Sequence, residues 1–569
     1  MPHAPSRVRQ AVALVAVYLG RAMVMLHPIS NVQHLATASY AGDARLNIWT
    51  LAWANHVFEH SGLALFDANI FFPARETFAY SEHLVGIAAF SFPIYALTHN
   101  PTLAYNLVWF TAFVLNGLAA HVFVWRFTRN HVAALVGGTG FAFSFFNMLH
   151  GHGHIQLVWS FWMPLSLIAI DAWVKKPSWT RASAVATTLT CQVLASWYLA
   201  VLVLLLAVTY LPFAVTRSRP SRACIRILSL QSLAIAAVLV LTVAPFARHY
   251  VNFPPGPVTE AAALSADLAS YLVPPQGTWL GTRWPSWLPG QPREPYGETT
   301  LFVGYVRWLL AAVGLLWMTR RISRRGHLTL PPGPARGAFT FACVLVVLGG
   351  WLSLGPGGDG LGIPSLYDLF VRLPGMRLFR APGRFALVLT LGMAIASAVG
   401  ALALITRRPR TGHAVVLLLV VASLAETYLL RFPAGRPQPE TVPKVYTFLR
   451  ELEPGAVVSL PFQLNTTTWW READYQYYST VHWRPIVNGY SRREPVGFFA
   501  LTNQIATFPS PASAKTLRDL GVSYVVLHSE RYADGAGQAV AEAQASPDFS
   551  LIARDGPQFL FAVRPGPET

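Results

Sequence analysis

Three short stretches of the sequence carry side chains that could do chemistry. The segment AGDARLNIWTLAW contains a single carboxylate directly after a glycine, HGHGH alternates histidine with glycine, and RLFRAPGRF repeats arginine. A carboxylate suits proton abstraction, imidazoles suit zinc, copper, nickel or iron, and arginine binds phosphate in a bidentate manner. The candidate residues are therefore Asp43, His150, His152, His154, Arg377, Arg380 and Arg384.

The elements that must position these residues are membrane helices. Hydrophobic residues make up 53% and charged residues 12% of the 569-residue chain, and the mean hydropathy is +0.40. A soluble domain carries about 25% charged residues. The net charge of +17 is spread over short loops between apolar runs of membrane-spanning length, so it does not indicate a nucleic-acid partner. The three cysteines fall in or beside apolar runs, which excludes a disulfide framework.

Loop charge predicts the direction of each helix. The apolar stretch 182–215 lies between two basic loops, and both are expected in the cytoplasm, so the chain must cross twice with a turn at Ser196. A cleaved signal peptide is an alternative for the first helix, but Arg21 interrupts its apolar core. We predict a cytoplasmic N-terminus, an outer C-terminus and eleven spans: 8–27, 102–126, 131–148, 156–174, 182–196, 198–215, 224–246, 300–319, 337–354, 384–405 and 413–432.

Two regions outside the membrane have their own predicted structure. The first outer loop, 28–101, contains helical stretches at 43–60 and 84–98, and the second is expected to lie along the membrane interface. Residues 433–569 predict a small soluble α/β domain with strands in AVVSLPF, RPIVNGY, VSYVVLH and FLFAV. The chain is thus expected to consist of a transmembrane domain over 1–432 and this outer domain.

Two further residues of the first loop, Glu82 and His83 in AYSEHL, join the candidates. They border an apolar helix, where a charge without a partner is costly. For Asp43 the alternative is an ordinary helix N-cap, since aspartate is a favoured capping residue.

Several of these stretches resemble a known superfamily. GDARLNIWTLAW, FDANIFFP, AYSEHL, MLHGHGHIQL and RLFRAPGRFALVL look like a set of bacterial membrane proteins described as GT-C-like. The long first loop, the acid soon after the first span and the outer C-terminal domain resemble the GT-C superfamily of integral-membrane glycosyltransferases. The resemblance implies transfer of a sugar from a polyprenyl-phosphate or polyprenyl-diphosphate donor to an acceptor on the outer face of the cytoplasmic membrane. Many members carry paired acids in the first loop, whereas the acid in GDA stands alone.

The resemblance and the chemistry together predict a site for a membrane glycosyltransferase of inverting mechanism. Asp43, Glu82 and His83 are expected to be catalytic, and Arg377, Arg380 and Arg384 to hold the donor phosphate, because the positive-inside rule disfavours three unpartnered outer arginines. Ordinary phospholipid headgroups are the alternative partner of the arginines. A divalent metal ion, or a substrate phosphate in its place, is expected at His150, His152, His154 and Glu82.

The expected partners are membrane lipids, the polyprenyl-phosphate sugar donor and a glycan, lipid or protein acceptor, with no nucleic acid. Two other classes of function remain open. A transporter is disfavoured because the sequence shows neither an internal repeat nor paired broken helices. A non-catalytic lipid- or glycan-binding assembly factor could keep the fold and lack the base.

Overall fold

The computed structural model describes residues 7–26, 41–251, 253, 258–285, 287–288, 297–319, 333–357, 364–429, 442–465, 468–532 and 536–566. The chain divides into two compact units. One, here called the membrane unit, comprises Met1–Ile29, Trp109–Gly151 and Ile155–Phe432. The other, here called the loop–sheet unit, comprises Ser30–Val108, His152–His154 and Pro433–Thr569. The first loop thus belongs to the same unit as the C-terminal segment.

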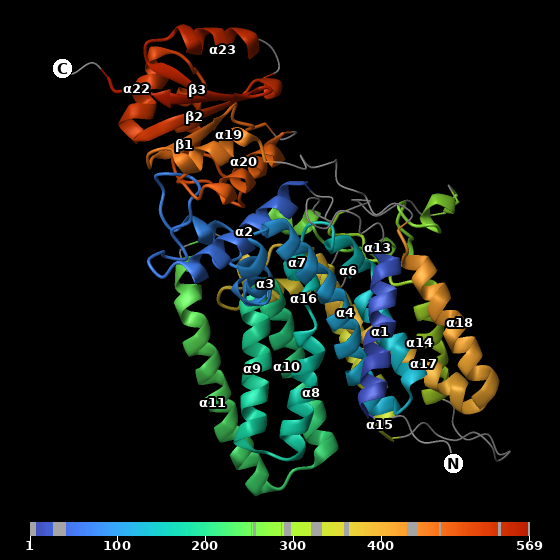
Figure 1. Ribbon diagram of the computed structural model, residues 1–569. Coiled ribbons are helices and arrows are strands. Elements are labelled where there is room, and N and C mark those ends of the chain that lie inside the picture. Colours follow the sequence, from blue (N-terminus) through green and yellow to red (C-terminus); the bar gives the residue numbers. More distant parts are fainter. Residues whose placement is uncertain are drawn as a thin grey trace, which may run out of the picture. The chain divides into compact units, whose positions relative to one another are not determined.

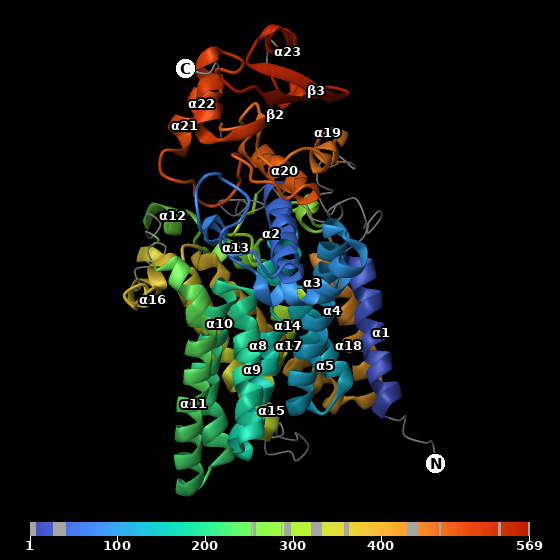
Figure 2. The same ribbon diagram turned by 60° about the vertical axis from the view of Figure 1, so that its left-hand side comes forward.

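Long apolar helices make up the membrane unit, and several of them run side by side in both views of the ribbon (Figures 1 and 2). Its helices are α1 (Arg7–Met25), most of α4 (Pro101–Thr128), α5 (His131–Ala142), α6 (Phe145–His150), α7 (Ile155–Val158), α8 (Trp162–Lys175), α9 (Trp179–Ala195), α10 (Trp197–Ser218), α11 (Arg222–Ala247), α12 (Val258–Ala263), α13 (Leu268–Leu272), α14 (Tyr305–Thr319), α15 (Gly333–Ser353), α16 (Leu366–Phe370), α17 (Ala386–Arg407) and α18 (Pro409–Thr427). Short 3-10 turns are η2 (Arg248–Tyr250), η3 (Gly281–Arg283), η5 (Met376–Leu378) and η6 (Pro382–Phe385).

The predicted membrane class is confirmed. Within the described residues, eight helical segments are long and apolar enough to cross a membrane. Each of the eleven predicted spans overlaps a helix, although 131–148 is divided between α5 and α6 and 156–174 between α7 and α8. The helices α5, α9 and α14 have only 12, 17 and 15 residues. The total of eleven spans therefore stays a prediction. The arginines that follow the predicted span 300–319 (Arg320, Arg321, Arg324 and Arg325) favour a cytoplasmic loop, and they lie outside the described residues.

The predicted break at Ser196 separates α9 from α10. Ser196 has an extended backbone, and its side chain accepts a hydrogen bond from the amide of Leu199, which caps α10. A buried carboxylate, Asp171 of α8, pairs with Lys175, with Arg126 near the end of α4 and with Arg217 near the end of α10. The carboxyl ends of these three helices therefore lie together. Because α8 and α10 run in the same direction, the intervening α9 must return between them.

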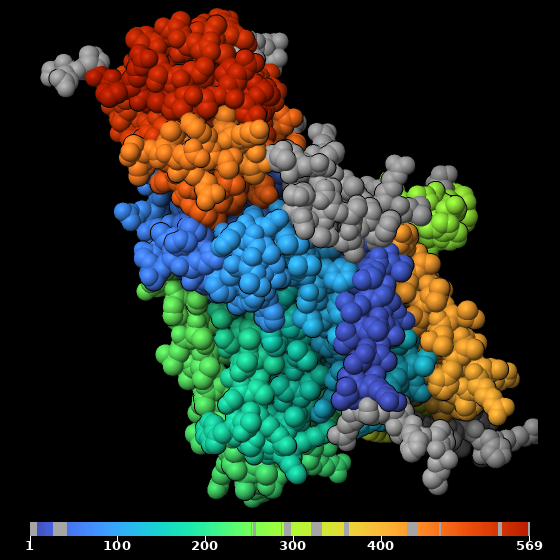
Figure 3. Space-filling view, in the orientation of Figure 1, coloured from blue at the N-terminus to red at the C-terminus, as the bar shows by residue number. Residues whose placement is uncertain are grey.

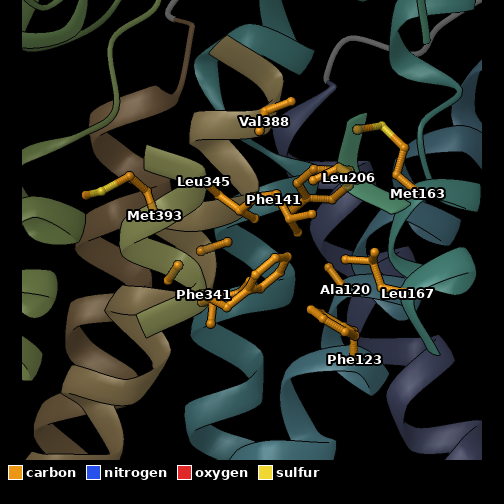
Figure 4. Packing of buried hydrophobic residues seen from close by; sticks show 14 of the residues in the cluster. Ala120, Phe123, Phe141, Met163, Leu167, Leu206, Phe341, Leu345, Val388 and Met393 are labelled. Atoms are coloured by element: carbon orange, nitrogen blue, oxygen red, sulfur yellow. The ribbon is translucent and has the colours of Figure 1, made fainter. Parts of the chain in front are cut away.

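The core of the membrane unit is centred on α17, which packs against α5, α14, α15 and α18. The close view in Figure 4 shows part of the buried apolar cluster, to which α4, α5, α8, α10, α15 and α17 contribute side chains. The labelled residues are Ala120, Phe123, Phe141, Met163, Leu167, Leu206, Phe341, Leu345, Val388 and Met393. The short turn η6 directly precedes α17, is buried, and packs against α15 and α17.

The loop–sheet unit combines the helices of the first loop with a small C-terminal sheet. Its elements are α2 (Ala41–Glu59), η1 (Thr77–Tyr80), α3 (Val85–Thr98), the first turns of α4, α19 (Lys444–Phe448), η7 (Leu449–Glu451), β1 (Ala456–Leu460), η8 (Trp469–Arg471), α20 (Glu472–Tyr478), η9 (Ser479–Val481), α21 (Phe498–Ile505), α22 (Pro511–Leu520), β2 (Val522–His528), η10 (Ser529–Arg531), α23 (Ala536–Ala545), β3 (Phe549–Asp555) and β4 (Gln558–Val563). In the space-filling view the blue surface of the first loop and the orange surface of the C-terminal segment are continuous (Figure 3).

The sheet has the strand order β1-β2-β4-β3, with β1 parallel to β2 and the other pairs antiparallel. Three of the four predicted strands are confirmed as β1, β2 and β4. The prediction of a strand in RPIVNGY was wrong, because this segment makes only an isolated bridge between Ile486 and Val457. The hairpin strand β3 was missed.

The RPIVNGY segment uses its remaining backbone groups on the first loop instead of on a sheet. The amide of Ile486 donates to the carbonyl of Asn69 (2.7 Å), and the amides of Phe71 and Phe72 donate to the carbonyls of Asn488 (3.0 Å) and Ile486 (2.9 Å). Since backbone groups buried without partners are costly, these bonds tie the first loop to the C-terminal segment. An isolated sheet domain would leave them unmade.

Topology can be tested with reporter fusions after Arg408 and after Pro437. We expect the two fusions to report opposite sides of the membrane, because α18 lies between them and has the length and hydropathy of a span. Alkaline phosphatase and fluorescent-protein activities in a bacterial host provide the measurement. The same side for both fusions would contradict the predicted outer location of the C-terminal segment.

A buried acid in α20 should make the stability of the loop–sheet unit depend on pH. Glu472 has no exposed surface, and its two oxygens accept hydrogen bonds from the amide of Gln463 (2.6 Å) and from Nδ2 of Asn488 (3.0 Å). Burial raises the pKa of Glu472 to about 7, although the hydrogen bonds from Asn488 and Gln463 act in the opposite direction. An unfolded chain restores an ordinary glutamate pKa of about 4.3.

At pH values between about 4.3 and about 7, Glu472 is protonated in the folded protein and ionised in the unfolded chain. The stability that Glu472 contributes is therefore complete below the unfolded pKa and is lost as pH rises through about 7. We expect the change Glu472→Gln to remove this part of the decline in thermal midpoint between pH 5 and pH 8, which unfolding of the intact chain in detergent would measure. The exposed Glu451→Gln is the control, and an unchanged slope in Glu472→Gln would contradict the assignment.

Candidate active site

Asp43 is the third residue of α2, so it lies inside the first helical turn and is not the residue that precedes it. The Tyr490 hydroxyl donates a hydrogen bond to Oδ1 of Asp43 at 3.0 Å. Nε2 of His154 lies 3.3 Å from Oδ2, and about a third (36%) of the Asp43 side chain is exposed. The carboxylate is thus held by two neighbours within the loop–sheet unit and still reaches solvent.

The glycine of the GDA motif makes this arrangement sterically feasible. A Cβ atom on Gly42 would lie 2.8 Å from the Tyr490 hydroxyl oxygen and 2.9 Å from Cβ of Trp470. Any larger residue would therefore displace the tyrosine from the carboxylate. Burial, followed by the negative charge of Asp43, raises the pKa of Tyr490, so the phenol stays protonated and donates.

Buried polar contacts fix the helix that carries Asp43. Arg45 forms an ion pair with Asp474 of α20, and Nη2 of Arg531 lies 2.8 Å from the other oxygen of Asp474. Asn47 donates to the carbonyl of Gly153 and so anchors the histidine turn beside α2. These residues are one and two turns from the start of the helix, where they set the position of Asp43.

The predicted histidine cluster is divided between the units. His154 faces Asp43, and His152 is buried in the same unit, where burial lowers its pKa to about 3 and keeps the imidazole neutral. His150 belongs to the membrane unit, and its Nε2 lies 3.6 Å from Oε2 of Glu298. The predicted convergence of His150 and His152 with Glu82 stays a prediction.

Glu82 and His83 follow η1, where Ser81 and Ser491 share a hydrogen bond of 2.7 Å. Nδ1 of His83 accepts a hydrogen bond from the amide of Val85 at 3.1 Å, which satisfies one of the first amides of α3. Burial lowers the pKa of His83 to about 3, so the ring is neutral and its proton is on Nε2. His83 therefore has a structural contact, while Glu82 is half-buried beside it.

Two of the three predicted phosphate-binding arginines have carboxylate partners in the membrane unit. Arg384, in η6, is buried, and its Nε lies 3.1 Å from both carboxylate oxygens of Glu298. Its guanidinium carbon lies 3.9 Å from the ring centre of Tyr198. Arg380 pairs with Glu260, whereas Arg377 is exposed. Since arginine has five N–H groups, both paired arginines can donate to a further oxygen ligand.

The glycine of APGRF has a steric role like that of GDA. A Cβ atom on Gly383 would lie 2.7 Å from the carbonyl oxygen of Glu298 and 3.0 Å from that of Leu264. Glycine thus lets the Glu298 backbone come close to η6, which brings its carboxylate to Arg384. The motif positions an arginine and a carboxylate together.

Sequence reasoning missed the partners of the predicted residues. Tyr490 belongs to a stretch that was interpreted as a strand, and Glu298 and Glu260 belong to the loop between the predicted spans 224–246 and 300–319, where no candidate residue was predicted. Each lies far from its partner in the chain, and the sequence separation of Tyr490 and Asp43 is 447. In the sequence, the only feature that points to Glu298 is its position as an acid at the end of a loop, directly before an apolar run.

Each unit contains one imidazole–carboxylate pair that offers ligand atoms for a metal. Asp43 with His154 and Glu298 with His150 each offer one oxygen and one nitrogen donor. This donor set suits zinc and related transition metals. The residue types therefore fit the predicted metal, and the pairs serve equally as hydrogen-bonded acid–base pairs.

The chain has the GT-C fold, which it shares with solved integral-membrane glycosyltransferases. Arabinofuranosyltransferase AftD from Mycobacteria is similar over 99% of this chain, with a TM-score of 0.59 and 15% identity, and this chain spans 40% of that protein. The apo oligosaccharyltransferase from Archaeoglobus fulgidus is similar over 94% of this chain and 71% of its own, with a TM-score of 0.50 and 14% identity. At such identities the likeness concerns the fold alone.

The chain belongs to the DUF6311 family, whose model, a domain of unknown function, matches residues 86–425. No curated protein matches the sequence.

Proposed function

We propose that the protein is a glycosyltransferase that moves a sugar from a polyprenyl-phosphate-linked donor to an acceptor at the outer face of a bacterial cytoplasmic membrane. The observation that carries this proposal is the carboxylate of Asp43. In a chain with a GT-C fold, it is held by Tyr490 and His154 and remains accessible to solvent. A simple helix cap would explain neither partner.

Asp43 is the base in this proposal. It takes the proton of the acceptor hydroxyl while the acceptor oxygen attacks the anomeric carbon from the face opposite the phosphate. The bond between that carbon and the phosphate oxygen breaks, its electron pair leaves with the polyprenyl phosphate, and the anomeric configuration inverts. Hydrogen bonding from Tyr490 orients the carboxylate, and His154 can receive the proton from Asp43 afterwards.

Arg380 and Arg384 stabilise the leaving phosphate. Negative charge develops on it as the bond breaks, and preorganised guanidinium groups lower the energy of that state. The ion pairs with Glu260 and Glu298 hold both side chains in place before the donor binds. The exposed Arg377 adds a weaker, long-range attraction for the same anionic group.

Glu82, His83 and His152 are proposed as accessory residues. A divalent metal, where bound, would use His150, His152, His154 or Glu82 as ligands and would supply charge neutralisation at the donor phosphate. The proposed acceptor is a glycan, a lipid or a protein.

The proposal is tested by reconstituting the purified chain into proteoliposomes with radiolabelled polyprenyl-phosphate sugars. Transfer of label to an extracted acceptor, together with release of polyprenyl phosphate, is the expected result. Binding of the lipid donor without any transfer would instead support the assembly-factor alternative, and sugar uptake without transfer would support a transporter.

A further inference from the structure

The opposite end of α2 carries a second cluster of ligating side chains. His56, Glu59 and His60 form the sequence H-x-x-E-H. One ligand atom from each residue lies within 4.8 Å of the other two. The spacing explains this closeness, because residues three and four apart share one face of a helix.

Each of the two imidazoles makes a further contact that fixes the orientation of its ring. Nδ1 of His60 lies 2.8 Å from the carbonyl oxygen of His56, so this nitrogen carries the proton and Nε2 keeps its lone pair. A hydrogen bond of this kind, from the non-ligating nitrogen to a carbonyl, is typical of metal-binding histidines. The His56 ring stacks on Trp483 of the same unit, with ring centres 4.3 Å apart and planes 12° apart.

We propose that His56, Glu59 and His60 form a binding site for a divalent transition metal of the zinc class. Bonds of about 2.0–2.1 Å in a tetrahedral site place ligand atoms about 3.3 Å apart, so small side-chain rotations close the observed separation. Two imidazoles and one carboxylate favour zinc, nickel or copper over magnesium or calcium, which prefer oxygen ligands. The fourth position is left for water.

The site has a mechanical consequence for the loop–sheet unit. Glu59 is the last residue of α2 and His60 directly follows it, so a bound metal closes the final turn of the helix. Because His56 stacks on Trp483, the same metal holds that turn against the C-terminal segment. This role is independent of sugar transfer, which uses the first turn of α2.

Zinc titration of the intact chain tests the proposal. The protein is purified with a histidine-free tag, stripped with a chelator and titrated with Zn²⁺ against a chromophoric competitor. We expect the exposed His60→Ala and the double change His56→Gln/His60→Gln each to lose one equivalent of zinc binding. Mg²⁺ is expected not to compete.

Two variants control for other histidines. His99→Asn removes an exposed histidine in a left-handed position that asparagine tolerates, and His154→Gln removes the histidine beside Asp43. Both should retain the equivalent that His60→Ala loses. The proposal is overturned if His60→Ala binds as much zinc as the parent with equal affinity, or if the lost equivalent follows His154→Gln instead. Thermal midpoints measured without metal establish that the variants are folded.

Discussion

Replacing Asp43 by asparagine is expected to reduce the rate of sugar transfer by about 100-fold or more, which is the usual contribution of a general base. The amide has the same shape and still accepts the hydrogen bond of Tyr490, but it cannot take a proton. Because Asp43 is the third residue of α2, the change leaves the cap of the helix intact. Initial rates of transfer by the purified variant in proteoliposomes provide the measurement.

Asp67→Asn is the matched control. Asp67 lies in the same loop, where it pairs with Arg75 and accepts a hydrogen bond from the amide of Glu76, so its change should leave the transfer rate near that of the parent. Tyr490→Phe should cause an intermediate loss, since the carboxylate stays but is no longer oriented. Transfer by a folded Asp43→Asn variant at the parent rate would remove Asp43 from the catalytic site.

Replacing Arg384 by glutamine is expected to weaken binding of the lipid donor by about 10- to 100-fold. A hydrogen bond to a charged group contributes about 1.5–3 kcal/mol, which corresponds to this change in Kd. The donor affinity is measured with a polyprenyl phosphate of defined chain length in detergent. Arg372→Gln, an exposed arginine of the same loop, should bind the donor like the parent.

The ion pair with Glu298 requires a second variant. Arg384→Gln alone leaves the carboxylate of Glu298 without its bidentate partner, and this alone can disturb the site. The double change Arg384→Gln/Glu298→Gln removes both charges, so that no buried carboxylate is left without its partner. Donor affinity should stay low in the double variant, and a return to the parent value would show that Arg384 serves only to neutralise Glu298.

The membrane class was predictable from the sequence because it rests on local composition. An apolar run of sufficient length has few alternatives to a helix, and the basic residues on both sides of 182–215 predict the break that the structure has at Ser196. The strands β1, β2 and β4 were predictable for the same reason, since each is a short apolar run that contains β-branched or aromatic residues. The GT-C fold followed from resemblance and was confirmed by structural similarity.

The site was only partly predictable, since its partners are remote in the chain. Asp43 and Arg384 could be predicted as candidates because a charge next to an apolar helix is energetically costly unless it has a partner or a function. No local sequence pattern around Tyr490 or Glu298 indicates which charged residue each of them contacts. The strand predicted in RPIVNGY failed for a related reason: its hydrogen-bonding groups are satisfied by Asn69, Phe71 and Phe72, which no local pattern reveals.

The backbone pairing of the first loop with residues 486–488 also constrains how the protein is made. During synthesis, Asp43 emerges 447 residues before the tyrosine that orients it. Every intervening membrane helix must be inserted before the loop finds its hydrogen-bonding partners. The candidate base is therefore assembled in one of the last steps of biogenesis, and a nascent chain held at the membrane would have no completed catalytic carboxylate. Such an order would withhold the proposed activity until residues 486–490 have reached the first loop.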